Sequence, residues 1–474
     1  MSLSVIAYNN LQISPYKLTN LIDLKITKKM NDHARLHFTG IVSEELKDSY
    51  VDITGVDTNI QVNQIDENSS STPLFAGVVV SIEIKAVRDI YYIEVEALSH
   101  TYTLDIKRKS RSFQHKDMPY SDLLQEVVSG YPGVDAMDTA SNGAKLEKFT
   151  IQYQETDWQF LKRMASRFHT GLIPASSFDK PKFYFGVPEG SFGGKLEDFH
   201  YTIKKRLSDF RISSENERKT GIESDFIYYE VETDKVLDIG SEVQLKEKML
   251  VVCEVYTQMK DSLLKHQYVI CSKKGMEQQT VYHRDITGVS VQGKVIAVEK
   301  DSVKVHLDID KEQSIAKAWW FPYSTAYTAE GNSGWYCMPE LNDYVRIYFP
   351  SHKEEEGVAL HSVRKNKEIT NKNKLSNPDV KYFRTAFGKE LMFSPEEIVI
   401  TGKDGEVFIK LNEKDGIQIF STKNIHIISQ ADITMNAEKR VTLSAKEEIN
   451  LTCKESRITL NGSTSISGKE VKTN

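Results

Sequence analysis

The stretch EEIVITGKDGEVFIKLNEKDGIQIFSTKNIHIISQADITMNAEKRVTLSAKEEINLTCKESRITLNGSTSISGKEVKTN, from Glu396 to Asn474, decides the fold. Apolar residues recur in it as pairs, and most pairs follow the previous one by eight residues. The members of a pair are two residues apart, so both point to one side of an extended strand. The pairs and the last single residue are Ile425 and Ile427, Ile433 and Met435, Val441 and Leu443, Ile449 and Leu451, Ile458 and Leu460, and Ile466. The pattern predicts a β repeat in which each unit is one short strand and a turn.

One such repeat is too small to be stable by itself. Burial of each apolar side chain contributes roughly 1.5–3 kcal/mol, against an ordering cost of about 1.5 kcal/mol for every residue. Eight residues are also too few to wind around a single-chain parallel β-helix with three faces. We therefore expect three chains to wind into an intertwined triple-stranded β-helix, a homotrimer whose core is made by the apolar pairs.

A single-chain β-solenoid and an ordinary antiparallel sheet are the alternatives. Only Phe408 and Phe420 are aromatic after Pro395, and no Asn-Gly or Asp-Gly dipeptide recurs with the period of the repeat. Such dipeptides are the strongest short-range signal for a hairpin. These features favour the trimer over both alternatives.

The composition describes a folded protein of several domains. The chain has 474 residues and a net charge of −6, from 61 basic and 67 acidic residues, so the bulk charge does not indicate nucleic acid or an anionic membrane as a partner. The four scattered cysteines, Cys253, Cys271, Cys337 and Cys453, suit a reducing cytoplasm. The start MSLSVIAYNN lacks the pattern of a signal peptide, so we expect cytoplasmic assembly.

The rest of the chain is predicted to be mainly β with a few helices. Residues 1–285 contain alternating segments such as LHFTGIV from Leu36 and VDITGV from Val51, which predict a β-rich region of two subdomains. Helices are expected at 119–129 and from Thr156, where Thr156 and Gln159 form a capping box. Residues 286–364 contain about five strand patterns, the number in an OB-like barrel. Residues 365–395 are expected to be a linker into the repeat at 396–474.

Three segments together carry a resemblance to a known family. They are FTIQYQETDWQFLKRMASRFHTGLIP from Phe149, GWYCMPELNDYVRIYFP from Gly334 within the barrel region, and the C-terminal repeat. In this order they resemble the VgrG-like spike proteins of contractile injection systems, which include type VI secretion spikes and phage tail hub-and-spike proteins. The segment WWFPYST from Trp319 suggests the shorter, Gram-positive phage-like branch.

The resemblance implies a structural role without catalysis. It implies a trimeric hub that adapts a spike to a hexameric inner tube protein and other baseplate components, a barrel that forms the neck, and a β-helix that pierces the target envelope with transient contact with its membrane. Some related spikes end in a His-x-His iron site, but His426 is the only histidine after His361. We therefore expect no metal, no cofactor, and a blunt tip that a PAAR-type cap or an effector covers.

Three patterns that could indicate catalysis are interpreted structurally. His33 and His37 enclose Ala-Arg-Leu and lack the glutamate of a zinc hydrolase motif, and GVPEGSFGGK from Gly186 lacks the pattern of a phosphate-binding loop. Glu155 and Asp157 have the residue types of a glycosidase pair, but an acidic residue at a helix start favours the helix dipole. The remaining alternatives for the whole protein are a tail-associated enzyme that degrades cell wall or capsule, and a trimeric receptor-binding tail fibre.

Overall fold

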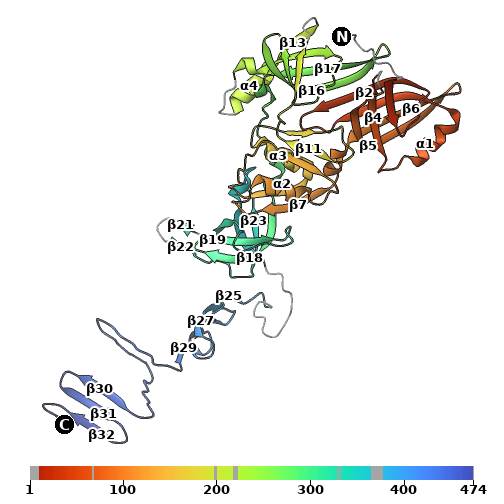
Figure 1. Cartoon of the computed structure of the whole chain (residues 1–474). Coiled ribbons are helices and arrows are strands. Elements are labelled where there is room, and N and C mark those ends of the chain that lie inside the picture. The colour runs from red at the N-terminus through yellow and green to blue at the C-terminus, as the bar shows by residue number, and fades with distance from the viewer. Residues whose placement is uncertain are drawn as a thin grey trace. The chain divides into compact units, whose positions relative to one another are not determined.

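The chain divides into two compact units, residues 1–366 and 367–474, each of which is described by itself. The computed structural model describes residues 10–66, 69–196, 200–216, 222–326, 328–329, 333–363 and 377–472. Figure 1 shows that strands dominate both units, as the sequence predicts. Among these described residues, no helix is both long enough and apolar enough to cross a membrane.

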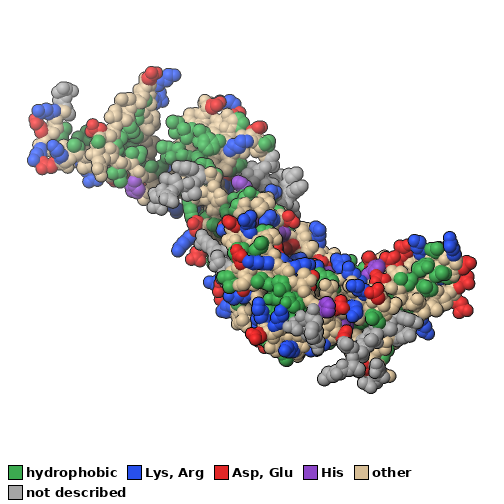
Figure 2. Space-filling view, turned by 90° about the horizontal axis from the view of Figure 1, so that it is seen from above, with side chains coloured by type: hydrophobic (Ala, Val, Ile, Leu, Met, Phe, Trp, Pro, Cys, Tyr) green, Lys and Arg blue, Asp and Glu red, His purple; other side chains and the backbone are tan. Residues whose placement is uncertain are grey.

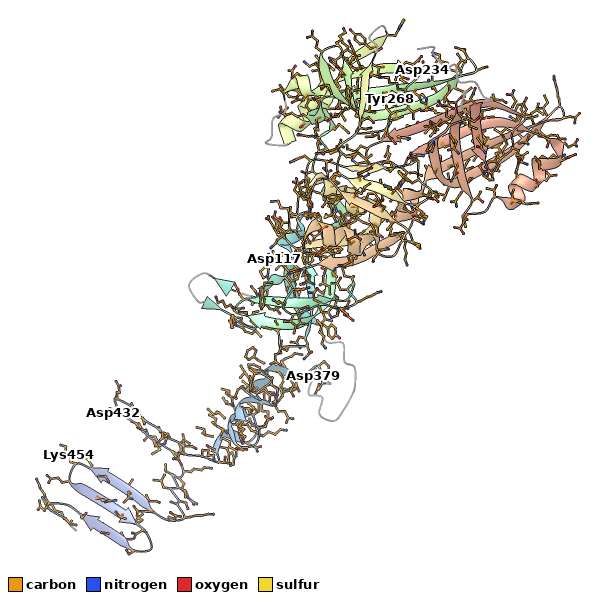
Figure 3. The ribbon with its side chains drawn as sticks, in the orientation of Figure 1. Asp117, Asp234, Tyr268, Asp379, Asp432 and Lys454 are labelled. Atoms are coloured by element: carbon orange, nitrogen blue, oxygen red, sulfur yellow. The ribbon has the colours of Figure 1, made fainter. Side chains whose placement is uncertain are left out.

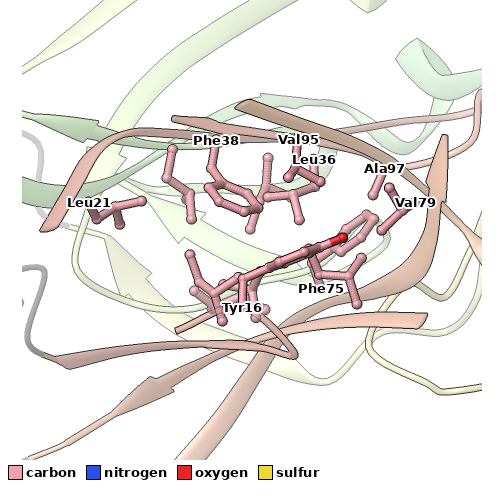
Figure 4. Close-up of a cluster of buried hydrophobic side chains, with 14 of the residues drawn as sticks. Tyr16, Leu21, Leu36, Phe38, Phe75, Val79, Val95 and Ala97 are labelled. Carbon is pink, nitrogen blue, oxygen red and sulfur yellow. The ribbon is translucent and has the colours of Figure 1, made fainter. Parts of the chain in front are cut away.

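A twelve-stranded sheet is the largest element of the first unit, and its first half lies between residues 11 and 99. The alternation of apolar and polar residues buries one side of each strand, and the buried residues form one core with Phe38, Phe75 and Val95 fully inside (Figure 4). The strands of this half are β1 (Leu11–Ser14), β2 (Asn20–Lys29), β3 (Arg35–Val42), β4 (Asn59–Ile65), β5 (Ser71–Val87) and β6 (Ile90–Ser99).

One strand predicted in this region is a helix instead. The segment VDITGV from Val51 alternates like a strand, but helix α1 spans Lys47–Ile53 and buries Tyr50 against the first core. The helix formers Glu44, Glu45 and Leu46 precede it and form a short 3-10 turn that leads into the helix. The helix-forming residues before Val51 therefore decide the local conformation, although the alternation of residues 51–53 alone predicts a strand.

The second half of the sheet has its own core, which includes Val252, Tyr268 and Ile270. Antiparallel pairing of β2 with β16 joins the halves, with Lys29 opposite Glu254 and Lys25 opposite Gln258. The strands of this half are β12 (Phe192–Leu196), β13 (Tyr201–Lys205), β14 (Ile227–Thr233), β15 (Glu242–Leu245), β16 (Lys248–Lys260) and β17 (Leu263–Cys271). Helix α4 (Leu207–Asn216) follows β13.

Two helices and a small sheet form a third core next in space to the sheet (Figure 1). The predicted capping box is confirmed, because the Thr156 side chain accepts from the Gln159 amide and the Gln159 side chain accepts from the Thr156 amide. Trp158 is buried, and its ring nitrogen donates to the Asn31 carbonyl at 3.1 Å. The elements are α2 (Tyr120–Val128), α3 (Asp157–Ser166), β8 (Asp135–Asp138), β10 (Leu172–Pro174) and β11 (Lys182–Phe185), with the pair β7 (Arg108–Phe113) and β9 (Thr150–Thr156) beside them.

A closed five-stranded barrel completes the first unit, as expected. Its strand order, β18-β19-β20-β24-β23, is that of an OB barrel. Val303, Val305 and Phe321 point into the barrel and are fully buried. The strands are β18 (Ser290–Glu299), β19 (Ser302–Leu307), β20 (Trp320–Ser324), β23 (Tyr344–Tyr348) and β24 (Val358–Val363), with a short hairpin of β21 (Thr328–Ala329) and β22 (Ser333–Gly334) between β20 and β23.

The second unit contains two antiparallel sheets in which each strand pairs with the next along the chain. Three turns contain glycines with positive φ in Asp404-Gly405, Asp415-Gly416 and Asn461-Gly462, hairpin signals that do not follow the eight-residue period. The single chain therefore pairs its own strands, and the intertwined β-helix stays a prediction about the assembled protein. The strands are β25 (Lys381–Arg384), β26 (Glu390–Phe393), β27 (Glu397–Lys403), β28 (Val407–Asn412), β29 (Gly416–Ser421), β30 (Ile449–Cys453), β31 (Ser456–Leu460) and β32 (Thr464–Ser467).

The segment 365–395, where a linker is expected, is only partly described. Residues 364–376 lie outside the described residues, while β25 and β26 lie inside the expected linker and belong to the five-stranded sheet. The antiparallel strand pattern of the second unit therefore begins about fifteen residues before Glu396.

A buried histidine in the second half of the sheet makes stability depend on pH. His266 of β17 is 2% exposed, and its Nδ1 lies 2.8 Å from the Thr257 hydroxyl on β16. Burial lowers the pKa of His266 to about 4, although Asp234 acts in the opposite direction. Figure 3 labels Asp234 and the neighbouring Tyr268 in this part of the unit.

We predict that the free energy of unfolding falls as the pH is lowered from about 6.5 to about 4. The unfolded chain takes up a proton on His266 in this range and the folded chain does not, which amounts to roughly 3 kcal/mol. Urea unfolding at a series of pH values measures how steeply the free energy of unfolding changes with pH. His266→Gln should flatten this slope, whereas His37→Gln, at a partly exposed position on β3, should keep the slope of the parent protein. Identical slopes for the parent and His266→Gln would contradict the assignment.

Candidate functional site

The three-stranded sheet β30-β31-β32 has one apolar face. Residues that pair directly across antiparallel strands point to the same face, and the register pairs Ile449 with Leu460, Leu451 with Ile458, and Ile458 with Ile466. Leu451 is 52% exposed and Ile466 is 57% exposed. Lys454 of the β30-β31 turn is labelled in Figure 3. Five large aliphatic side chains thus share a face that this chain does not cover.

The opposite face of this sheet is polar. The Asn450 side-chain oxygen accepts hydrogen bonds from Arg457 Nε at 3.2 Å and from the Thr459 hydroxyl at 2.8 Å. A sheet with one apolar and one polar face is normally covered by another layer on its apolar side. The sheet therefore lacks the layer that would complete it.

The five-stranded sheet β25-β29 repeats the arrangement. Its register lines up three further pairs on one face, namely Ile398 with Leu411, Ile400 with Ile409, and Ile409 with Ile419. The exposed fractions are 40% for Leu411 and 60% for Ile419, and Figure 2 shows hydrophobic side chains reaching the surface of this unit at the left of the view. We call the apolar faces of the two sheets together the uncovered apolar face. A surface of this kind usually marks an interaction site.

The structure brings together five of the eleven residues predicted for the trimer core. They are Ile449, Leu451, Ile458, Leu460 and Ile466 on the three-stranded sheet. The other six, Ile425, Ile427, Ile433, Met435, Val441 and Leu443, lie between the sheets in a segment without assigned strands, and all six are more than half exposed. The face of β26-β29 is absent from the predicted core, although the same spacing of two residues in Ile398 and Ile400 indicates it.

The two acidic residues weighed as a catalytic pair are both held in ion pairs. Asp157 is fully buried and accepts hydrogen bonds from Arg111 at 2.7 Å, Tyr131 at 2.6 Å and Lys109 at 2.5 Å. Burial, followed by the hydrogen bond to Asp157, raises the pKa of Tyr131. Glu155 accepts from Arg163 at 2.8 Å. The two carboxylates therefore bind different basic groups, which gives each of them a structural role.

Arg163 joins helix α3 to the barrel. Its guanidinium contacts Glu354 from the β23-β24 connection, donates to the Ile151 carbonyl at 2.7 Å, and pairs with Glu155. Arg167, one turn later, donates to Glu354 at 3.2 Å. Arg163 and Glu354 are both 3% exposed, so this ion-pair network is shielded from water. It fixes the barrel against the helical part of the first unit.

The remaining patterns weighed for chemistry also have structural roles. His33 lies 2.9 Å from the Thr101 hydroxyl, whereas His37 lies 2.8 Å from Glu94, so the two rings have different partners. The glycine-rich stretch from Gly186 leads into strand β12. Within the described ranges, no group of three or more His, Cys, Asp or Glu side chains is arranged to hold a metal ion.

The comparisons with known proteins agree with this architecture. Residues 54–168 match the family model described as the phage tail baseplate hub (GPD). The Escherichia coli c3393 protein, described as a component of the type VI secretion system similar to the T4 phage tail proteins gp27 and gp5, aligns with a TM-score of 0.52 and 12% identity, covering 75% of this chain and 99% of its own. A Francisella PdpA-VgrG complex aligns with a TM-score of 0.55 and 10% identity, covering 88% of both chains. No curated protein sequence matches.

These matches define the class of the protein. The chain has the fold of the phage tail hub proteins, with a β-rich hub followed by a small barrel. More closely, its fold is similar to that of the VgrG-like proteins, in agreement with the resemblance seen in the sequence.

We predict that Glu354→Gln destabilises the first unit by about 3 kcal/mol, because removal of one partner from a buried ion pair leaves the other charge without full compensation. Calorimetric unfolding of the full chain measures the change. Glu356→Gln is the matched control on the same turn, where the carboxylate is 44% exposed and a substitution should have little effect on stability. Equal effects of the two substitutions would contradict a stabilising role for the network.

Proposed function

We propose that this protein is the trimeric hub-spike of a contractile injection system, with a structural role and no catalytic one. The uncovered apolar face is the observation that carries the proposal. It contains more than ten large aliphatic or aromatic side chains on the two sheets of the second unit. A stable protein does not leave a face of this size in water, so other copies of the chain cover it in the assembled state.

Three copies complete the second unit better than one. Each level of a triangular prism receives an apolar pair from each chain, and each buried side chain contributes roughly 1.5–3 kcal/mol. The segment with Val441 and Leu443 gains most, because in one chain its apolar pairs are exposed and have no strand partners. We propose that this segment forms strands when the three chains associate, and that all eleven predicted residues then line one core.

The first unit is proposed to be the base that caps the inner tube. Its large sheet consists of two halves with separate cores, joined by the β2-β16 pairing. Three copies present six such halves, a number that suits a ring of six tube subunits. In this arrangement the hub contacts the hexameric inner tube protein on one side and other baseplate components around its edge.

The second unit is proposed to be the piercing shaft. Hydrogen bonds between strands of three chains resist axial load, because no single chain can unravel without the others. Among the strands that the structure describes, β32 pairs only with β31, so we propose that its edge is available to a PAAR-type cap or an effector. The particle would assemble in the cytoplasm of the producing cell and touch the target membrane only during contraction.

The mass of the full-length protein in dilute native buffer tests the trimer. Light scattering coupled to size exclusion should give three times the chain mass of 54.0 kDa, and side views by negative stain should show a thin needle on a broad base. A folded protein of single-chain mass would contradict both the trimer and the spike.

We predict that the double variant Val441→Asp, Leu443→Asp abolishes the heat-stable trimer. The substitutions place unpaired carboxylates of three chains together in the core, where each buried charge carries a penalty of several kcal/mol. Thr442→Asp is the matched control, because residue 442 points to the other side of the same strand. Oligomer mass and melting temperature measure the result, and equal losses for the control would show that the inward assignment is wrong.

A further inference from the structure

The outer face of the barrel carries a row of exposed groups on β19 and β20. Inward-pointing Val303 and Phe321 are fully buried, so their neighbours along each strand point outward. On the outer face Trp320 pairs with Lys304 and Pro322 pairs with Ser302. Trp320 is 37% exposed, and the Lys304 ammonium lies 4.9 Å from its ring centre. The face therefore presents an aromatic ring that is accessible and held in place by a cation.

The turn between β18 and β19 extends this row with a second aromatic group. The Tyr336 hydroxyl donates to the Lys300 carbonyl in that turn at 2.5 Å, and Tyr336 is 72% exposed. Trp335, the preceding residue, is 64% exposed. Lys300 in the turn and Lys304 on β19 are four positions apart, so the row extends beyond a single aromatic ring. A row with an aromatic group at each end suits a chain of sugar units better than a single small molecule.

The row coincides with the ligand face of OB barrels. In this fold the second and third strands, together with the loop between the first and second, bind oligosaccharides or oligonucleotides. Here these elements are β19, β20 and the turn that contains Lys300. The connection between β23 and β24 is already engaged, because Glu354 binds Arg163 and Arg167 there. The accessible part of the ligand face is the row from Trp320 to Tyr336.

The charges on the barrel distinguish between the two kinds of ligand. Residues 286–364 contain eleven acidic and eight basic residues, and the turn reads Glu299-Lys300-Asp301. Polyanionic nucleic acid needs a basic surface, which this barrel does not have. Pyranose rings are uncharged and have apolar faces that pack on aromatic rings, while their hydroxyls bond to groups such as the Ser302 hydroxyl.

We propose that the outer face of β19 and β20, with Trp320 and Tyr336 as its two ends, binds a neutral oligosaccharide chain, for which chitohexaose and the glycan strands of cell walls serve as probes. The site would hold the neck of the protein against glycan strands as the envelope is crossed. The inference goes beyond the proposed spike role, because it rests on the barrel alone and not on the second unit.

Binding of the full-length protein to chitohexaose and to purified peptidoglycan sacculi tests the proposal. Titration calorimetry with chitohexaose and co-sedimentation with sacculi should both detect binding. Trp320→Ala and Tyr336→Ala should each weaken it about tenfold or more, as expected when an aromatic anchor is truncated. Trp320→Phe should retain most of the binding. Phe178→Ala removes an aromatic side chain that is 45% exposed outside the barrel, and it should change nothing.

Three results would overturn the proposal. The first is the absence of binding to both probes at millimolar sugar, and the second is tighter binding to a deoxythymidine oligonucleotide than to chitohexaose. The third is a loss of oligomer mass in Trp320→Ala, measured by light scattering, which would show that another copy of the chain covers this face. This test is independent of the test of the spike. A trimer that binds no glycan would contradict only the glycan site, and a single chain that binds glycan would contradict only the spike.

Discussion

The apolar face that one chain cannot cover is the constraint on which the rest of the architecture depends. In the first unit the large sheet packs one of its faces into cores, and residues such as Phe38, Tyr268 and Phe321 are fully buried. In the second unit the same alternation of side chains leaves Ile419 and Leu451 more than half exposed. Residue type does not explain the difference, because both units bear large aliphatic side chains on their strands. The two sheets of the second unit have no second layer among the described residues to cover their apolar faces.

Local patterns in the sequence predicted much of the fold. The capping box of Thr156 and Gln159, helix α2 and the five barrel strands depend on residues close together in the chain, and all are present. The joining of the two sheet halves by β2 and β16 was not predictable in this way. It pairs Lys29 with Glu254, and no periodicity in one strand identifies a partner more than two hundred residues away. The ion-pair network of Arg163 and Glu354 was not predictable either, because the two residues are 191 positions apart in the sequence.

The candidate site shows even more clearly that local patterns do not identify the partner of a strand. The spacing of two residues places Ile449 and Leu451 on one face of β30, because that follows from the pleat of any strand. The spacing did not specify the strand partners, because a run of similar repeats fits several registers. The dipeptides Asp404-Gly405 and Asn461-Gly462 decide the pairing within a single chain, and they do so through a backbone conformation that glycine adopts at little cost.

The two units depend on different kinds of physical interaction. Hydrophobic burial is non-directional, so a core of Ile, Leu and Val favours association strongly while tolerating variation among repeats. A buried ion-pair network is directional, because Arg163 satisfies Glu155, Glu354 and the Ile151 carbonyl only in one orientation. Such a network adds little net stability but penalises every other arrangement of its partners. In the proposed spike the barrel is the neck that transmits force along one axis, a task for which a fixed angle matters more than additional stability. The ion-pair network lies where the barrel joins helix α3.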